Sequence, residues 1–123
     1  MPPGLRFFID QSVLGLGKML ARARADVAHP GHWRLPEVPI GTPDVDWMGV
    51  CEARGLVVIA RDRRIRSKPV ELAKFHEHKL RAFWITGEQD LNNWGYLERT
   101  VRHWKRIEGL IAVRGPGPWC YGI

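Results

Sequence analysis

Short apolar runs alternate with amphipathic stretches along the chain, and this alternation most restricts the folds open to it. Helices are expected at about 11–24, 44–54, 69–78 and 90–107. Strands are expected at 5–9, 26–28, 56–60 and 80–85, and the third is the clearest because it is apolar, β-branched and bounded by turn residues. Strands alternating with helices predict an α/β fold with three layers, α/β/α, around a largely parallel central sheet.

Capping residues and periodicity refine these helices. Asp10 and Ser12 supply cap chemistry for the first helix, and Thr42 with Pro43 at the first helical position begins the second, which Gly55 ends. The last helix should bury one continuous apolar stripe because its apolar residues recur at intervals of three and four. The stripe comprises Leu91, Trp94, Leu97, Val101, Trp104 and Ile107.

Size and composition indicate one ordinary globular domain, 1–123. Glycines and prolines at 115–118 predict an irregular tail over about 112–123, in which 119–121 could add a short strand. No apolar run is long enough to cross a bilayer, and the N-terminus lacks the pattern of a secretory signal. Cys51 and Cys120 have no metal-site spacing. We therefore expect a cytoplasmic protein without membrane association.

Three aspartates stand where strands end or helices begin. Asp10 closes the run 5–9, Asp44 opens the second helix, and Asp62 follows the run 56–60. The carboxyl ends of parallel strands line one crevice, so these side chains are expected to meet there. Gathered carboxylates repel one another unless a hard cation neutralises them, and Mg²⁺ prefers such oxygen ligands. The pattern predicts metal-dependent chemistry on phosphodiesters.

Most of the excess positive charge surrounds one of these aspartates. The chain carries a net charge of +6, and residues 61–81 hold eight lysines and arginines against three acids. Such a segment attracts polyanions, although a solvated surface strip that only aids solubility explains the charge equally well.

The chain resembles the PIN-domain superfamily, metal-dependent nucleases that include the VapC-type toxins. The resemblance spans residues 5 to 85 and is carried by Phe7-Phe8-Ile9-Asp10, by Asp44-Val45-Asp46-Trp47 and by Gly55-Leu56-Val57-Val58-Ile59-Ala60-Arg61-Asp62-Arg63-Arg64. It implies a PIN-like fold in which Asp10, Asp44 and Asp62 are catalytic ligands of Mg²⁺ or Mn²⁺. The family usually adds a glutamate between the first two aspartates, and here either Asp46 replaces it or the site has three acids.

The same resemblance implies roles for other residues and partners. Ser12 could orient a water at the ion, and arginines beside the third aspartate would grip the phosphates of an RNA substrate. These arginines are Arg61, Arg63, Arg64 and Arg66. VapC-type toxins are held inactive by an antitoxin and often dimerise, so a cognate antitoxin protein and a homodimer are expected by resemblance.

Two other functions fit parts of the sequence. A receiver-like signalling domain also gathers acids around Mg²⁺, and a basic RNA-binding module without catalysis would explain the charge alone. Trp33 and Trp119, in irregular segments, are candidates for a base-stacking or partner surface, with capping of the core favoured for both. Cleavage that is lost in Asp10→Asn would separate the nuclease from both alternatives.

Overall fold

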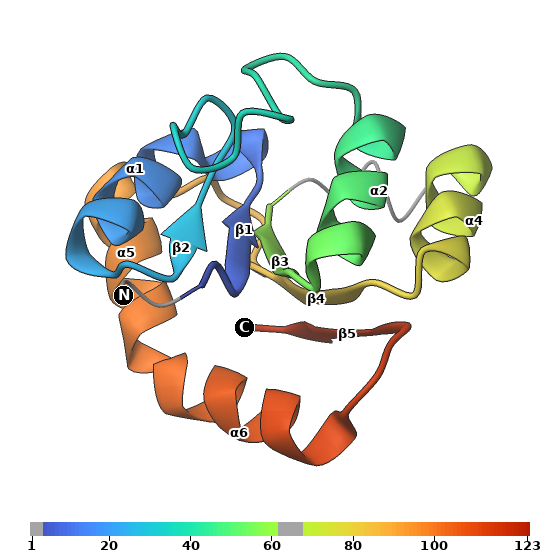
Figure 1. Ribbon diagram of the computed structural model, residues 1–123. Helices are drawn as coiled ribbons and strands as arrows, with labels where there is room; N and C mark the ends of the chain where they lie inside the picture. The colour runs from blue at the N-terminus through green and yellow to red at the C-terminus, as the bar shows by residue number, and fades with distance from the viewer. Residues whose placement is uncertain (1–3, 62–67) are drawn as a thin grey trace.

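The computed structural model describes residues 4–61 and 68–123, which form a parallel sheet between two layers of helices (Figure 1). The strands of this part of the chain are β1 (Phe7–Ile9), β2 (Val27–Ala28), β3 (Val57–Ala60), β4 (Arg81–Trp84) and β5 (Trp119–Gly122). The helices are η1 (Gln11–Val13), α1 (Leu14–Ala23), α2 (Asp44–Arg54), α4 (Pro69–Glu77), α5 (Asn93–Arg102) and α6 (Trp104–Arg114).

The strand order is β2-β1-β3-β4-β5, and every neighbouring pair is parallel. The chain passes from β1 to β2 on one side and then returns to β3 on the other side of β1. The carboxyl ends of β1 and β3 therefore flank the point where the winding direction reverses, which is where open α/β sheets bind ligands. The expected largely parallel sheet is confirmed.

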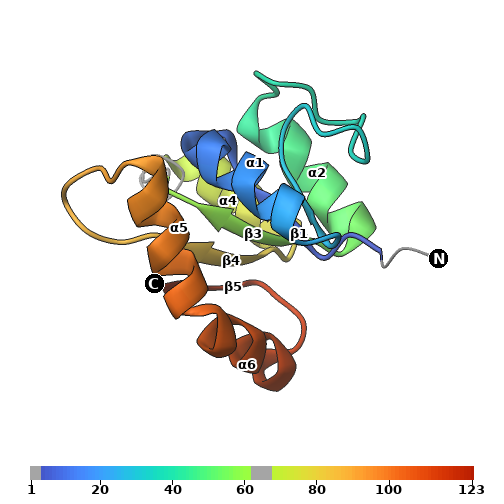
Figure 2. The same ribbon diagram turned by 90° about the vertical axis from the view of Figure 1, so that its left-hand side faces the viewer.

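Each face of the sheet has its own hydrophobic core, which confirms the three-layer prediction. On one face Phe8 and Val58 pack under Trp47 and Met48 of α2 and Phe75 of α4. On the other face, Phe7, Ile9 and Phe83 pack under helices α1, α5 and α6. Figure 2 shows α2 and α6 on opposite sides of the sheet. Alternate residues of the central strands thus serve opposite layers, and β1 and β3 are buried on both sides.

Local signals placed most helix ends correctly. Asp10 caps η1, and Gly55 ends α2 in the left-handed conformation, with φ 67°. The expected cap by Thr42 is wrong, because Pro43 holds that position and the Thr42 hydroxyl donates to the Pro39 carbonyl instead.

The expected helix at 90–107 is wrong, because two helices meet at His103. One straight helix of that length would extend about 27 Å, far beyond strands of four residues or fewer. The buried face of α5 is formed by Tyr96 and Thr100, and Trp94, expected in the core, is 70% exposed.

The C-terminal segment is more regular than the expected tail over 112–123. Helix α6 continues to Arg114, and β5 extends the sheet beside β4. Trp119 and Tyr121 alternate with exposed residues and contact Phe83, with ring centroids 5.5 and 6.3 Å away. This inward alternation is what makes 119–122 a strand. None of the described helices is long and apolar enough to span a bilayer.

Candidate functional site

Asp10 is a buried carboxylate at the carboxyl end of β1. Its backbone N–H donates to the Ile59 carbonyl of β3, which fixes it between the two central strands. The side chain is 4% exposed, and its Oδ2 accepts the backbone N–H of Ser12 at 3.1 Å. Within the described residues this neutral donor is its one hydrogen-bond partner. A buried charge with so little compensation is costly to the fold, so a cationic ligand would stabilise it.

Asp44 reaches the same place from the first turn of α2. Its Oδ1 accepts the indole N–H of Trp47 at 3.0 Å. Trp47 is 1% exposed and packs on Phe8 with ring centroids 5.0 Å apart, so the donor is held rigidly by the core. The positive end of the helix dipole also favours a carboxylate at this position.

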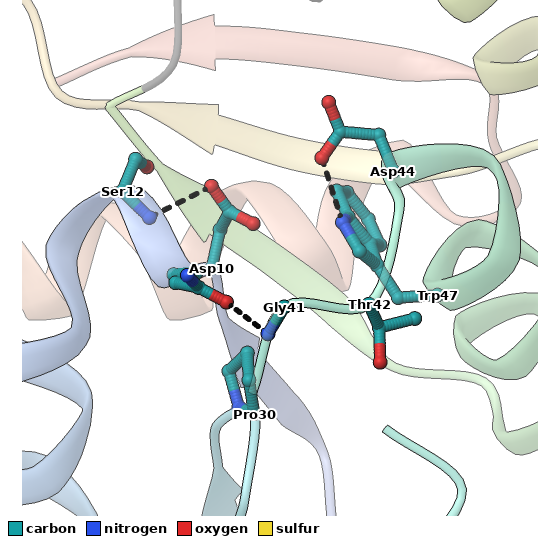
Figure 3. A pocket seen from close by; sticks show the side chains of 8 residues that line it. Asp10, Ser12, Pro30, Gly41, Thr42, Asp44 and Trp47 are labelled. Atoms are coloured by element: carbon teal, nitrogen blue, oxygen red, sulfur yellow. Dashed lines mark hydrogen bonds between the residues drawn. The ribbon is translucent and has the colours of Figure 1, made fainter. Parts of the chain in front are cut away.

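Both carboxylates extend into one pocket of about 270 Å³ (Figure 3). Its other walls come from η1 and from the ends of the segment 29–43, which connects β2 to α2. One hydrogen bond joins these walls, from the Gly41 N–H to the Gln11 side chain at 2.7 Å. The lining residues are Asp10, Gln11, Ser12, Pro30, Gly41, Thr42, Asp44 and Trp47.

Ser12 connects the ends of the two central strands. Its N–H holds the Asp10 carboxylate, and its Oγ accepts the Arg61 backbone N–H at 3.0 Å. Arg61 directly precedes Asp62 in the chain. Ser12 therefore fixes the position of β1 relative to the segment that leads into the third predicted ligand.

The Arg61 side chain is buried in the structure and does not make the contact with RNA phosphate that the sequence analysis expects. Arg61 is 9% exposed and donates to the carbonyls of Ile85 and Gln89, both at 2.9 Å. Its Nε also lies 3.5 Å from the Asp90 carboxylate. A buried guanidinium needs such acceptors, and its role here is to anchor the segment that follows β4.

The position of Asp46 does not fit its expected role as a metal ligand. It is exposed and does not line the pocket, because two residues along a helix turn a side chain roughly 200° away. Asp62, Arg63, Arg64 and Arg66 lie outside the described residues. Within those residues, no three histidines, cysteines or acids gather into a metal cluster.

The chemistry of the pocket fits a hard divalent cation. Asp10 and Asp44 present carboxylate oxygens beside polar walls, and such oxygens are the ligands that Mg²⁺ and Mn²⁺ prefer. Cys51, in the core below, is not a candidate ligand. Burial, together with the nearby charge of Asp10, raises the pKa of its thiol far above the ordinary value. The thiolate that would bind a soft metal therefore does not form.

Sequence reasoning missed the hydrogen bond from Trp47 and the contributions of Gln11 and Gly41. The Asp44-x-x-Trp47 spacing was a usable signal, because residues three apart share a helix face. Nothing local in the sequence indicated the walls from 29–43, because their position depends on how that segment folds back onto the pocket.

Comparison with known proteins identifies the architecture built around this pocket. Residues 5–87, 83 of the 123 residues, match the family model described as PIN like domain. No curated protein and no solved structure matched the chain. PIN-like domains are generally nucleases and typically depend on a divalent metal. With its parallel sheet and with two of its aspartates in one pocket at the reversal point, the chain belongs to the PIN-like domain family.

Proposed function

We propose that this protein is a metal-dependent endoribonuclease whose active site is the Asp10–Asp44 pocket. The observation that carries the proposal is the meeting of these carboxylates at the reversal point of the sheet, where Asp10 is buried with one neutral donor among the described residues. The family supplies the class of chemistry, and the pocket supplies a place for it.

Asp10 and Asp44 would hold Mg²⁺ or Mn²⁺ together with Asp62, the next acid of the family pattern. Such an ion activates the attacking water and offsets charge at the phosphodiester. The remaining residues act on the ligands themselves. Ser12 holds the Asp10 carboxylate, and Trp47 holds that of Asp44.

RNA is the proposed substrate because of the charge of the chain and its resemblance to VapC-type toxins. The net charge of +6 favours a polyanion. We assign the phosphate contacts of the strand to Arg63, Arg64 and Arg66, which follow the third aspartate in the sequence.

Incubation of the purified protein with end-labelled single-stranded RNA tests this proposal. Cleavage is expected with Mg²⁺ or Mn²⁺ and not in EDTA. Asp10→Asn and Asp44→Asn should each lower the rate on the order of 10²- to 10⁴-fold, because each removes a charge that holds the ion. Asp46→Asn is the matched control, an aspartate of the same helix turn outside the pocket, and should cleave like the wild type. Binding without cleavage in any metal would instead identify a non-catalytic RNA-binding module.

The toxin role is a further part of the proposal. It includes a cognate antitoxin whose segment enters the acidic pocket and presents an arginine to the carboxylates, and a possible homodimer. Induced expression should arrest growth with the wild type and not with Asp10→Asn. Arrest by both variants alike would contradict a toxic ribonuclease.

A further inference from the structure

The segment 29–43 leaves the pocket wall at Pro30 and presents Trp33 to solvent. Trp33 is 82% exposed although the segment around it is firmly held. The Gly31 N–H donates to the Val38 carbonyl at 2.8 Å, and Leu35 and Val38 are fully buried. The exposure of this indole is therefore a property of an ordered segment, and capping of the core is excluded as its role.

The neighbours of Trp33 suit an aromatic ligand. The His32 ring stacks beside the indole with centroids 5.8 Å apart and planes 25° apart. The Arg34 guanidinium lies 6.0 Å from the ring centre, and a hollow of about 220 Å³ opens next to both, reaching Ala21 of α1 and Arg24, which follows that helix. Because most of the indole remains exposed, a flat ring can stack on it without displacing these neighbours.

The charge around this hollow favours a polyanion. Arg24 and Arg34 line it together with His32, and among the described residues no acid does. Aromatic faces interleaved with cations are the arrangement that binds single-stranded nucleic acid, because bases stack while phosphates meet positive charge.

We propose that Trp33 is a stacking platform for an unpaired base of the RNA strand whose backbone occupies the Asp10–Asp44 pocket. This inference rests on the proposed function. Pro30 lines that pocket, and three residues of chain place the Trp33 Cα within about 11 Å of the Pro30 Cα. The stacked base therefore lies a few nucleotides from the cut.

Binding without cleavage gives the direct test. Fluorescence anisotropy of labelled single-stranded RNA in EDTA measures affinity for the intact strand. Trp33→Ala should bind between about fivefold and 100-fold more weakly, the usual loss of one base–aromatic stack, and Trp33→Phe should retain most of the affinity. Trp94→Ala removes another exposed tryptophan from α5 and should leave affinity unchanged. Equal affinity of wild type and Trp33→Ala would overturn the proposal and leave a protein partner for this surface.

A scan of the RNA with single abasic sites locates the stacked base. At one position an abasic site should weaken RNA binding by the wild type. The same site should not weaken RNA binding by Trp33→Ala any further, because the two changes remove the same contact. Independent losses at every position would overturn the stack. If the wild type cleaves RNA and Trp33→Ala does not change the RNA affinity, the stacking platform is wrong and the proposed nuclease stands. Binding that depends on Trp33 without cleavage in Mg²⁺ or Mn²⁺ would defeat the proposed nuclease and spare the platform.

Discussion

Two buried aspartates at opposite ends of the sheet show how differently one residue type can be used. Asp26, just before β2, and Asp10, just after β1, are 6% and 4% exposed. Asp26 accepts hydrogen bonds from Arg24 at 2.9 Å and from Arg6 at 3.2 Å. Asp10 accepts one backbone N–H from within the described residues.

The difference separates a carboxylate that the protein pairs with cations from one that it leaves with a single neutral donor among the described residues. Burying a charge is costly unless the protein pairs it, and at Asp26 two guanidinium groups do so. Arg6 continues this network to Glu108, which ties α6 to the start of β1. At the other end Asp10 and Asp44 face a pocket, and Asp10 is buried there with one neutral donor among the described residues. The first end maintains the fold, and the second is available for chemistry.

Removal of the charge of Asp26 should have the largest effect on stability. Asp26→Asn leaves two guanidinium groups without their shared carboxylate and should lower the free energy of unfolding by about 1–3 kcal/mol, measured by urea denaturation. The metal dependence of cleavage should be unchanged, because Asp26, Arg6 and Arg24 do not line the Asp10–Asp44 pocket.

The companion variant is Asp10→Asn in metal-free buffer. Asparagine caps helices as well as aspartate does, and this change removes a poorly compensated charge. Its free energy of unfolding should therefore be at least that of the wild type. Equal destabilisation by both variants would remove the distinction between the two ends.

The pH dependence of stability should come from the Asp26 end. Burial alone raises the pKa of Asp26, but the hydrogen bonds and charges of Arg24 and then Arg6 lower it by more, so it lies below the ordinary 3.8. A depressed pKa contributes stability above the unfolded-state value, and this contribution is lost as the pH falls through the folded-state value. The stability difference between wild type and Asp26→Asn should be constant near neutral pH and shrink below about pH 4. A difference that grows on acidification would contradict the ion pair.

Divalent metal should stabilise only the pocket end. A ligand that binds the folded state at ten times its Kd adds about 1.4 kcal/mol, so Mn²⁺ should raise the Tm of the wild type by a few degrees. The rise should persist in Asp46→Asn and vanish in Asp10→Asn. Thermal unfolding in matched buffers checks this without any nuclease assay, and an equal rise in all three proteins would place the metal elsewhere.

The sequence predicted a structural feature correctly where the signal for that feature was local. The runs 5–9 and 56–60 and the cap residue Asp10 act within a few residues, so the central strands and the position of Asp10 at the end of β1 followed from them. The inward face of α5 depends instead on how that helix packs against α1, and periodicity alone chose Trp94 and Val101 over Tyr96 and Thr100. Arg61 was misassigned for a related reason, because only the fold places the carbonyls of Ile85 and Gln89 within its reach.

Trp47→Phe should have the smallest of these effects and tests whether the core positions a ligand of the pocket. Phenylalanine keeps the ring beside Phe8 and removes the N–H that Asp44 accepts. A hydrogen bond to a partly buried carboxylate is worth about 1 kcal/mol, so cleavage should slow about fivefold. The Mn²⁺ concentration for half-maximal rate should rise as well, because a carboxylate without its donor holds the ion less firmly.

Trp104→Phe is the matched control for that change. Its indole N–H is buried without a hydrogen-bond partner among the described residues, so the same substitution removes ring volume and no hydrogen bond. It should lower stability slightly and leave the metal dependence of cleavage as in the wild type. If Trp47→Phe merely loosened the core, both variants would lose stability and neither would shift the Mn²⁺ requirement. A shift confined to Trp47→Phe means that the aromatic core beneath the pocket helps to set its affinity for the ion.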